Sequence, residues 1–182
     1  HISKTKKMIL SALMLTLSIV LSRFLSIKTP FLSISFSFVP TMLSAIWLGP
    51  KYTCLIAGIA DLIGAIVFPF GEFFIGFTVS SILAGLIYGL ILYKKEGELS
   101  KKSLLIRLII STLAVTLVIN TGLNTLWLVI MYDKAFIALL MARVVKELIM
   151  VPIQVITMFL LVQATRKDYK KIFNIRLGSY MR

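Results

Sequence analysis

The feature of this sequence that most constrains its fold is a succession of long apolar stretches separated by short clusters of charged residues. Of 182 residues, 59% are hydrophobic and only 15% are charged. An α-helix needs about 20 predominantly apolar residues to cross the hydrocarbon core of a bilayer. The pattern predicts an all-α integral membrane protein, a single transmembrane domain over residues 1–182 with six helices. We expect these helices at about residues 8–25, 39–48, 52–67, 73–93, 104–131 and 135–164.

Proline and glycine divide these stretches. Gly49-Pro50 is a helix-stop signal after the second expected helix, and residues 68–72 form a turn before the fourth. Residues 27–38 contain Pro30 and several Ser and Thr residues, a composition that favours an ordered external loop. Pro152 lies inside the sixth expected helix, where we expect a kink.

The distribution of Lys and Arg predicts the orientation. Fifteen lie on the side that holds both termini, and three lie on the other: Arg23, Lys28 and Lys134. Because the cytoplasmic side carries the excess of positive charge, we expect both termini in the cytoplasm. The formal net charge of +13 therefore indicates topology and contact with lipid headgroups rather than binding of nucleic acid.

Five charged residues qualify by their depth, since they lie in the outer half or near the middle of their expected helices: Arg23, Asp61, Arg143, Lys146 and Glu147. A charge inside a bilayer costs several kcal/mol unless it is paired, hydrated or bound to a ligand, so each is a functional candidate. Together they could line one cavity open to the outside. The alternative is structural ion pairing, because Arg143 and Glu147 have the i,i+4 spacing of one helix face.

Polar residues also cluster on the fifth expected helix. Asn120, Asn124 and Trp127 share a face by their i, i+4, i+7 spacing. Two amides beside an indole suit a planar heterocycle, which the amides would bind by hydrogen bonds and the indole by stacking. A hydrogen-bonded seam between helices is the alternative use of such residues.

Small residues recur at i,i+4 spacing, which favours the close packing of transmembrane helices. The pairs are Ala12 with Thr16, Ala60 with Gly64, and Gly85 with Gly89. The pair on the first helix, Ala12 with Thr16, could serve either internal packing or docking of a partner helix.

Enzyme chemistry finds little support. The one histidine is His1 and the one cysteine, Cys54, lies in an apolar stretch, so we expect no metal centre, no catalytic nucleophile and no cofactor. The sequence has no phosphate-binding loop, so it cannot hydrolyse ATP by the usual route. Energy for uphill transport would have to come from a partner or an ion gradient.

The run LNTLWLVIMYDKAFIALLMARVVKELIMVPIQVITMFLL, at Leu123–Leu161, resembles the last third of the folate-specific S components of energy-coupling-factor (ECF) transporters. The resemblance rests on Asn-Thr-x-Trp-Leu, on the Arg143 and Lys146 pair, and on Pro-Ile-Gln at 152–154. Upstream, LSRFLSI and DLIGAIVFPFGEFFIGFT are similar to the same family.

This resemblance implies a six-helix S-component fold in a bacterial plasma membrane, with a binding pocket that opens outward beneath the loop between the first two helices. It also implies partners, namely a membrane coupling (T) subunit and two cytoplasmic ATPases. S components typically dock through Ala-xxx-Ala on the first helix, where this sequence offers Ala12 and Thr16.

The implied ligand is folate. Its pterin needs an amide or acidic edge and an aromatic stack, its aminobenzoyl ring an apolar slot, and its two carboxylates cations. We expect Arg23 to bind a carboxylate or the pterin edge, and Lys146 to serve either the ligand or Asp61. The expected substrate-binding residues are Arg23, Phe38, Trp47, Phe77, Thr78, Asn120, Asn124, Trp127, Arg143 and Lys146.

Two other classes remain open. The first is an S component for another vitamin, such as riboflavin or pantothenate. The second is an intramembrane enzyme, which predicts turnover without partners, or a scaffold, which predicts no tightly bound small ligand.

Overall fold

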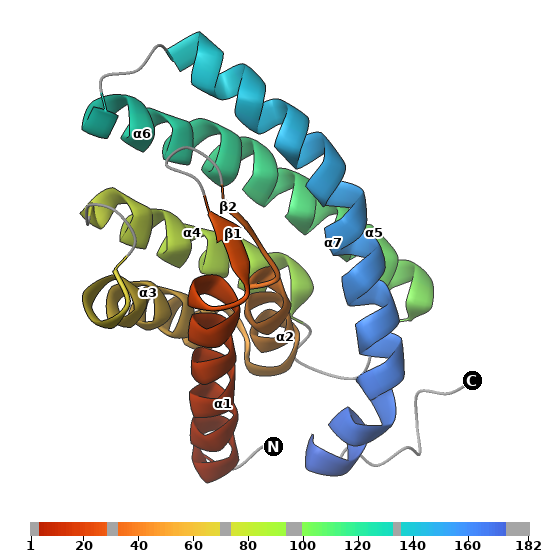
Figure 1. The fold of residues 1–182 in the computed structure, drawn as a ribbon. Coiled ribbons are helices and arrows are strands. Elements are labelled where there is room, and N and C mark those ends of the chain that lie inside the picture. The colour runs from red at the N-terminus through yellow and green to blue at the C-terminus, as the bar shows by residue number, and fades with distance from the viewer. Residues whose placement is uncertain (1–3, 29–32, 70–73, 94–99, 133–135, 174–182) are drawn as a thin grey trace.

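A computed structural model of the chain describes residues 4–28, 33–69, 74–93, 100–132 and 136–173 (Figure 1). The elements in order are α1 (Lys4–Arg23), β1 (Ser26–Lys28), β2 (Ser33–Ser35), α2 (Phe38–Leu48), α3 (Pro50–Val67), α4 (Ile75–Leu92), α5 (Lys101–Ala114), the π-helix η1 (Val115–Leu123), α6 (Asn124–Tyr132) and α7 (Phe136–Phe173). Because α5, η1 and α6 follow one another without interruption, they form one long helix, and the described residues make six helical rods.

Five of these rods are long and apolar enough to cross a membrane, and α2, with 11 residues, is shorter. Large apolar side chains cover the outside of the bundle. Ile66, Leu90 and Ile137, for example, are 74%, 64% and 71% exposed in the isolated chain. A bilayer would cover such side chains, since helices satisfy their own backbone hydrogen bonds in hydrocarbon. The predicted all-α membrane fold is confirmed.

The expected external loop at residues 27–38 contains regular structure. Strands β1 and β2 pair antiparallel, with Ser26 opposite Ser35 and Ile27 opposite Ile34. Alternation of serine with a β-branched residue suits a short pleated ribbon, and the pairing satisfies backbone groups near the ends of α1 and α2. The predicted turn at residues 68–72 lies largely outside the described residues.

Helices α3 and α4 pack closely because α4 presents glycines to α3. A Cβ atom added to Gly85 would lie 2.9 Å from the carbonyl oxygen of Thr53, and one added to Gly89 would lie 2.7 Å from Cβ of Pro50. Backbones can approach this closely only where side chains are absent. The predicted role of the Gly85 and Gly89 pair in helix packing is confirmed.

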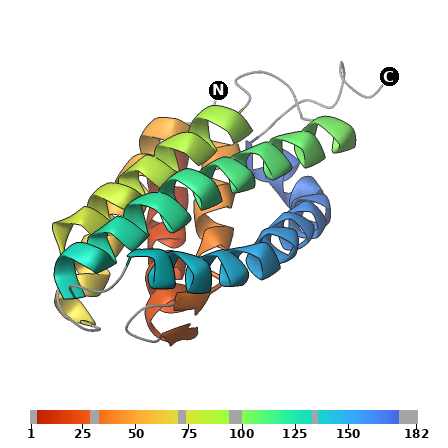
Figure 2. The same ribbon diagram turned by 90° about the horizontal axis from the view of Figure 1, so that it is seen from above.

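In Figure 1, α4 lies between α3 and the long helix α5–η1–α6, and in Figures 1 and 2 α7 lies on the side of the molecule away from α3. Helix α7 continues through Pro152 and curves along its length (Figure 1). The hydrophobic core holds the fully buried residues Met42, Leu92, Leu108 and Met158. It is therefore concentrated near the C-terminal end of α4 and the N-terminal end of α5, which leaves the other half of the bundle for a cavity.

Candidate binding cavity

A cavity of about 330 Å³ is lined by side chains from all six helical rods. This size lies at the lower end of the range for small-molecule sites. Helix α4 and helix α7 contribute the most residues. The lining consists of Ser18, Ser22, Arg23, Ser37, Phe38, Thr41, Ala57, Ala60, Asp61, Phe77, Ser80, Ser81, Ala84, Tyr88, Val115, Ile119, Asn120, Asn124, Arg143, Lys146, Glu147, Met150 and Gln154.

All five charged residues that the sequence places deep within the membrane helices line this cavity: Arg23, Asp61, Arg143, Lys146 and Glu147. Three cations and two carboxylates give a formal charge of 3 − 2 = +1. Charges in a bilayer are driven to face the interior of the bundle, where they can pair or meet a polar ligand. The cavity is therefore suited to an anionic ligand.

Two contacts of α7 order these charges. Nζ of Lys146 lies 3.1 Å from Oε1 of Glu147, with the two side chains 15% and 4% exposed. Nε of Arg143 donates a hydrogen bond of 3.1 Å to the backbone carbonyl oxygen of Asn120. Glu147 thus forms an ion pair with Lys146, and it also interacts electrostatically with Arg143, the i,i+4 partner considered from the sequence.

The hydrogen-bond partner of Asp61 is Thr78 and not Lys146, which the sequence had suggested. Oδ2 of Asp61 accepts a hydrogen bond of 2.6 Å from Oγ1 of Thr78, across the α3–α4 interface. Lys146, which could have served Asp61, is paired with Glu147 instead. Thr78 therefore lies behind the cavity wall and orients a carboxylate that lines it.

Asn120 and Asn124 both line the cavity, and Trp127 does not. Its Nε1 donates a hydrogen bond of 2.8 Å to Oγ of Ser80, and its ring packs edge-on against Phe74 at 5.6 Å between centroids. Because Ser80 itself lines the cavity, Trp127 supports the wall from behind. This hydrogen bond uses the only donor group of the indole.

Three expected substrate-binding residues thus lie outside the lining: Trp47, Thr78 and Trp127. Trp47 packs against the hydrophobic core. The other seven expected residues line the cavity, including the aromatic side chains of Phe38 and Phe77.

Sequence reasoning missed several lining residues, among them Tyr88, Thr41 and Gln154. A signal for Gln154 was present. Arg143, Glu147, Met150 and Gln154 follow one another at spacings of four, three and four, which is one face of a helix, and all four line the cavity.

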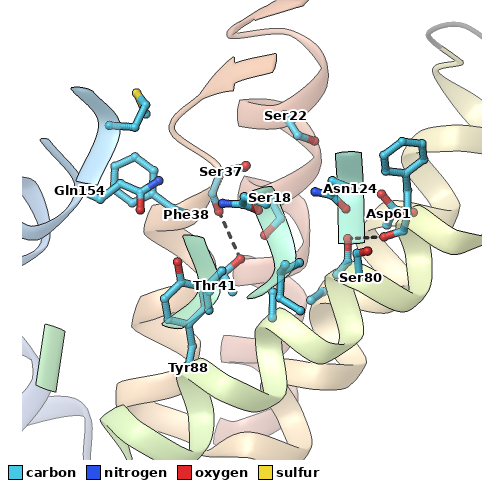
Figure 3. Close-up of a pocket in the computed structure, with 18 of the residues that line it drawn as sticks. Ser18, Ser22, Ser37, Phe38, Thr41, Asp61, Ser80, Tyr88, Asn124 and Gln154 are labelled. Atoms are coloured by element: carbon cyan, nitrogen blue, oxygen red, sulfur yellow. Dashed lines mark hydrogen bonds between the residues drawn. The ribbon is translucent and has the colours of Figure 1, made fainter. Parts of the chain in front are cut away.

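Several polar atoms of the lining are buried and have no hydrogen-bond partner within the described part of the chain: Oγ of Ser18, Nε of Arg23, Oδ1 of Asn124 and Oε1 of Gln154. In Figure 3, Tyr88 and Gln154 lie on one side of the cavity, and Asp61, Ser80 and Asn124 on the other. Buried polar atoms of proteins are nearly always bonded to something. Donors and acceptors at both sides of this cavity are therefore available to a ligand.

The expected docking pair lies away from the cavity. Ala12 and Thr16 are exposed on α1, and Oγ1 of Thr16 donates its hydrogen bond to the carbonyl oxygen of Ala12 at 2.9 Å. The neighbouring Leu13 and Leu17 are exposed as well. This face of α1 carries exposed apolar side chains and is accessible to another helix.

Among the described residues, no group of three His, Cys, Asp or Glu side chains could hold a metal ion.

Comparison with known proteins gives concordant results. The family model for the substrate-specific component of ECF transporters matches residues 6–162. A protein of Leuconostoc mesenteroides described as the folate transporter FolT is 42% identical over 177 residues, covering 93% of this chain and 92% of the relative. A FolT of Clostridium novyi is 37% identical over 156 residues, covering 86% and 87%.

Two solved structures are similar. A crystal structure of FolT bound with folic acid matches with a TM-score of 0.77 and 38% identity, covering 86% of this chain and 92% of that one. The structure of the S component of a bacterial ECF transporter matches with a TM-score of 0.68 and 24% identity, covering 93% and 99%. The second match bears on the fold alone.

Proposed function

Since the chain belongs to the family of substrate-specific components of ECF transporters, we propose that it is the folate-binding membrane subunit of such a transporter. The observation that carries the proposal is the cavity, in which three side-chain amides, aromatic rings and a surplus of cations converge. Relatives at 37% and 42% identity that are described as folate transporters support folate over other vitamins.

Folate asks for three kinds of contact. Its pterin carries a hydrogen-bonding edge that Asn120 and Asn124 can match, since each amide both donates and accepts. Its ring systems need apolar and aromatic surface, which Phe38, Phe77 and Tyr88 supply. Its two carboxylates need cations, and Arg23 is our candidate for one of them, because a guanidinium can bind a carboxylate through two hydrogen bonds.

The transport step requires partners. As a bacterial membrane protein of this family, the subunit would capture folate outside the cell and deliver it inward with a membrane coupling subunit and two cytoplasmic ATPases. The sequence has no phosphate-binding loop of its own, which supports this division of labour. The excess of Lys and Arg on one side supports cytoplasmic termini, and exposed Ala12 and Thr16 are the candidate docking pair on α1.

The test is calorimetric titration of the purified, detergent-solubilised subunit with folate in the absence of ATP. Calorimetry is preferable to tryptophan fluorescence, because neither Trp47 nor Trp127 lines the cavity. We expect saturable one-to-one binding without ATP, and weaker binding of riboflavin and pantothenate. Tighter binding of riboflavin or pantothenate than of folate would identify that vitamin, and not folate, as the substrate. Turnover of folate by the isolated subunit would refute a purely binding role.

A further inference from the structure

Helix α3 leaves space for the Arg23 side chain at Gly64. A Cβ atom added to Gly64 would collide with Nε of Arg23 and would lie 3.0 Å from both Cζ and Nη2. Real Cβ atoms rarely make contacts this short, so the guanidinium occupies the volume that a side chain at Gly64 would fill. Only glycine leaves that volume free.

The position of Arg23 is fixed from two directions. Arg23 is the last residue of α1, and the ring of the next residue, Phe24, packs edge-on against Phe68 at the end of α3, with 4.8 Å between centroids. The ends of the two helices are thereby held together. The space left by the missing side chain of Gly64, which we call the seat, then determines where the guanidinium lies relative to the cavity that Arg23 lines.

The Arg23 guanidinium is available for a ligand. Its Nε is buried and has no hydrogen-bond partner within the described ranges, which also contain no ion pair to Arg23. Ala60 and Asp61, one turn and almost one turn before Gly64 on α3, line the same cavity. The seat therefore belongs to the cavity wall and not to a remote interface.

We propose that Gly64 is a positioning residue for ligand binding, which seats the Arg23 guanidinium where it can bind an anionic group of the ligand. The inference rests on the proposed folate-binding function. It assigns to Gly64 a role different from the helix packing that its Ala60–Gly64 spacing suggested.

The expected effect falls on binding and not on folding. The atoms in the way of a Cβ at Gly64 are the far end of a flexible side chain, so alanine would displace the guanidinium and leave the helices in place. Alanine also favours a helix more than glycine does. We therefore expect Gly64→Ala to weaken folate binding about tenfold, part of the effect of losing a charge-assisted hydrogen bond, with no loss of apo melting temperature.

The experiment is a double-mutant cycle on the purified subunit, with folate affinity by calorimetry and melting without ligand for the parent, Gly64→Ala, Arg23→Ala and the double variant. Gly58→Ala is the matched control. Gly58 is also on α3, and its added Cβ would lie 2.8 Å from a side-chain atom of Ile82, but neither residue lines the cavity. We expect Gly64→Ala to change affinity by less than about twofold once Arg23 is alanine, and Gly58→Ala to change it equally little.

Two results would overturn the inference: parent-like affinity in Gly64→Ala, or an equal loss with and without Arg23. If Gly64→Ala melts lower than the parent, the double variant decides, because removing the guanidinium must then restore the melting temperature. A parent that binds no folate overturns the proposed function and this inference with it. A parent that binds folate but shows no coupling in the cycle overturns the inference alone.

Discussion

The ion pair of Lys146 and Glu147 allows a sharp prediction about stability. The two charged atoms are 3.1 Å apart, and the carboxylate side chain is only 4% exposed. Removing one partner of a buried pair leaves the other charge buried and uncompensated, which costs about 3–5 kcal/mol. Because Lys146 is 15% exposed and lines a cavity, and because Arg143 still interacts electrostatically with Glu147, we take the lower end, about 3 kcal/mol, for Lys146→Ala.

The expected result is a lower melting temperature of the subunit without ligand. For a chain of this length, each kcal/mol shifts the midpoint by about 2–4 °C, so Lys146→Ala should lower it by about 6–12 °C. Replacing both partners in Lys146→Met/Glu147→Leu should recover most of this loss, since apolar residues of similar volume often replace a buried pair at little cost. Melting is followed by circular dichroism in one detergent, and Lys101→Ala, an exposed lysine on α5, is the control.

Two outcomes would refute this reasoning. The first is a Lys146→Ala variant that melts with the parent, which would mean that Glu147 does not depend on the lysine. The second is a double variant that is no more stable than the single one, which would mean that the loss comes from packing and not from an uncompensated carboxylate.

Three further predictions concern single residues. Arg23→Ala should raise the dissociation constant for folate roughly ten- to hundred-fold, the loss of one charge-assisted contact, while melting without ligand barely changes; parent-like affinity would remove Arg23 from the site. Trp127→Phe removes the hydrogen bond to Ser80 and should cost about 1 kcal/mol of stability, with a smaller loss of affinity. If the loss of binding free energy for folate exceeds the loss of unfolding free energy, the indole itself contacts the ligand. Gly89→Ala should cost about 1–3 kcal/mol of stability because the added Cβ meets the backbone of Pro50, which cannot move aside; unchanged melting would argue against close α3–α4 packing.

The interior charges were the part of the site most accessible to sequence reasoning. Arg23, Asp61, Arg143, Lys146 and Glu147 all line the cavity, because the cost of placing a charge against lipid forces such residues toward a common interior. Which charges pair was not predictable in the same way. Lys146 and Glu147 are adjacent in sequence, a spacing that gives no helical-face signal, yet they form an ion pair, in addition to the electrostatic interaction of Glu147 with Arg143.

The position of Trp127 shows where periodicity is insufficient. Asn120, Asn124 and Trp127 share a face only if the helix keeps 3.6 residues per turn. Asn120 lies in the π-helix η1, whose hydrogen bonds run from residue i to i+5, so the residues beyond it are turned relative to an ideal α-helix. Trp127 consequently faces Ser80 on α4 and Phe74, the residue before α4. No residue type in Val115–Leu123 signals a π-helix, which tertiary contacts must help to maintain.

The π-helix also bears on how the cavity wall moves. Such helices are rare and persist where surrounding contacts hold them. The local stability of η1, which forms part of the cavity wall, therefore depends on contacts with neighbouring helices. Arg143 supplies one of those contacts through the carbonyl oxygen of Asn120. A ligand group that draws the Arg143 guanidinium toward itself would therefore loosen or tighten backbone hydrogen bonds on a different helix. A bound ligand would then change how often the backbone hydrogen bonds of η1 break, even where the average shape of the cavity wall stays the same.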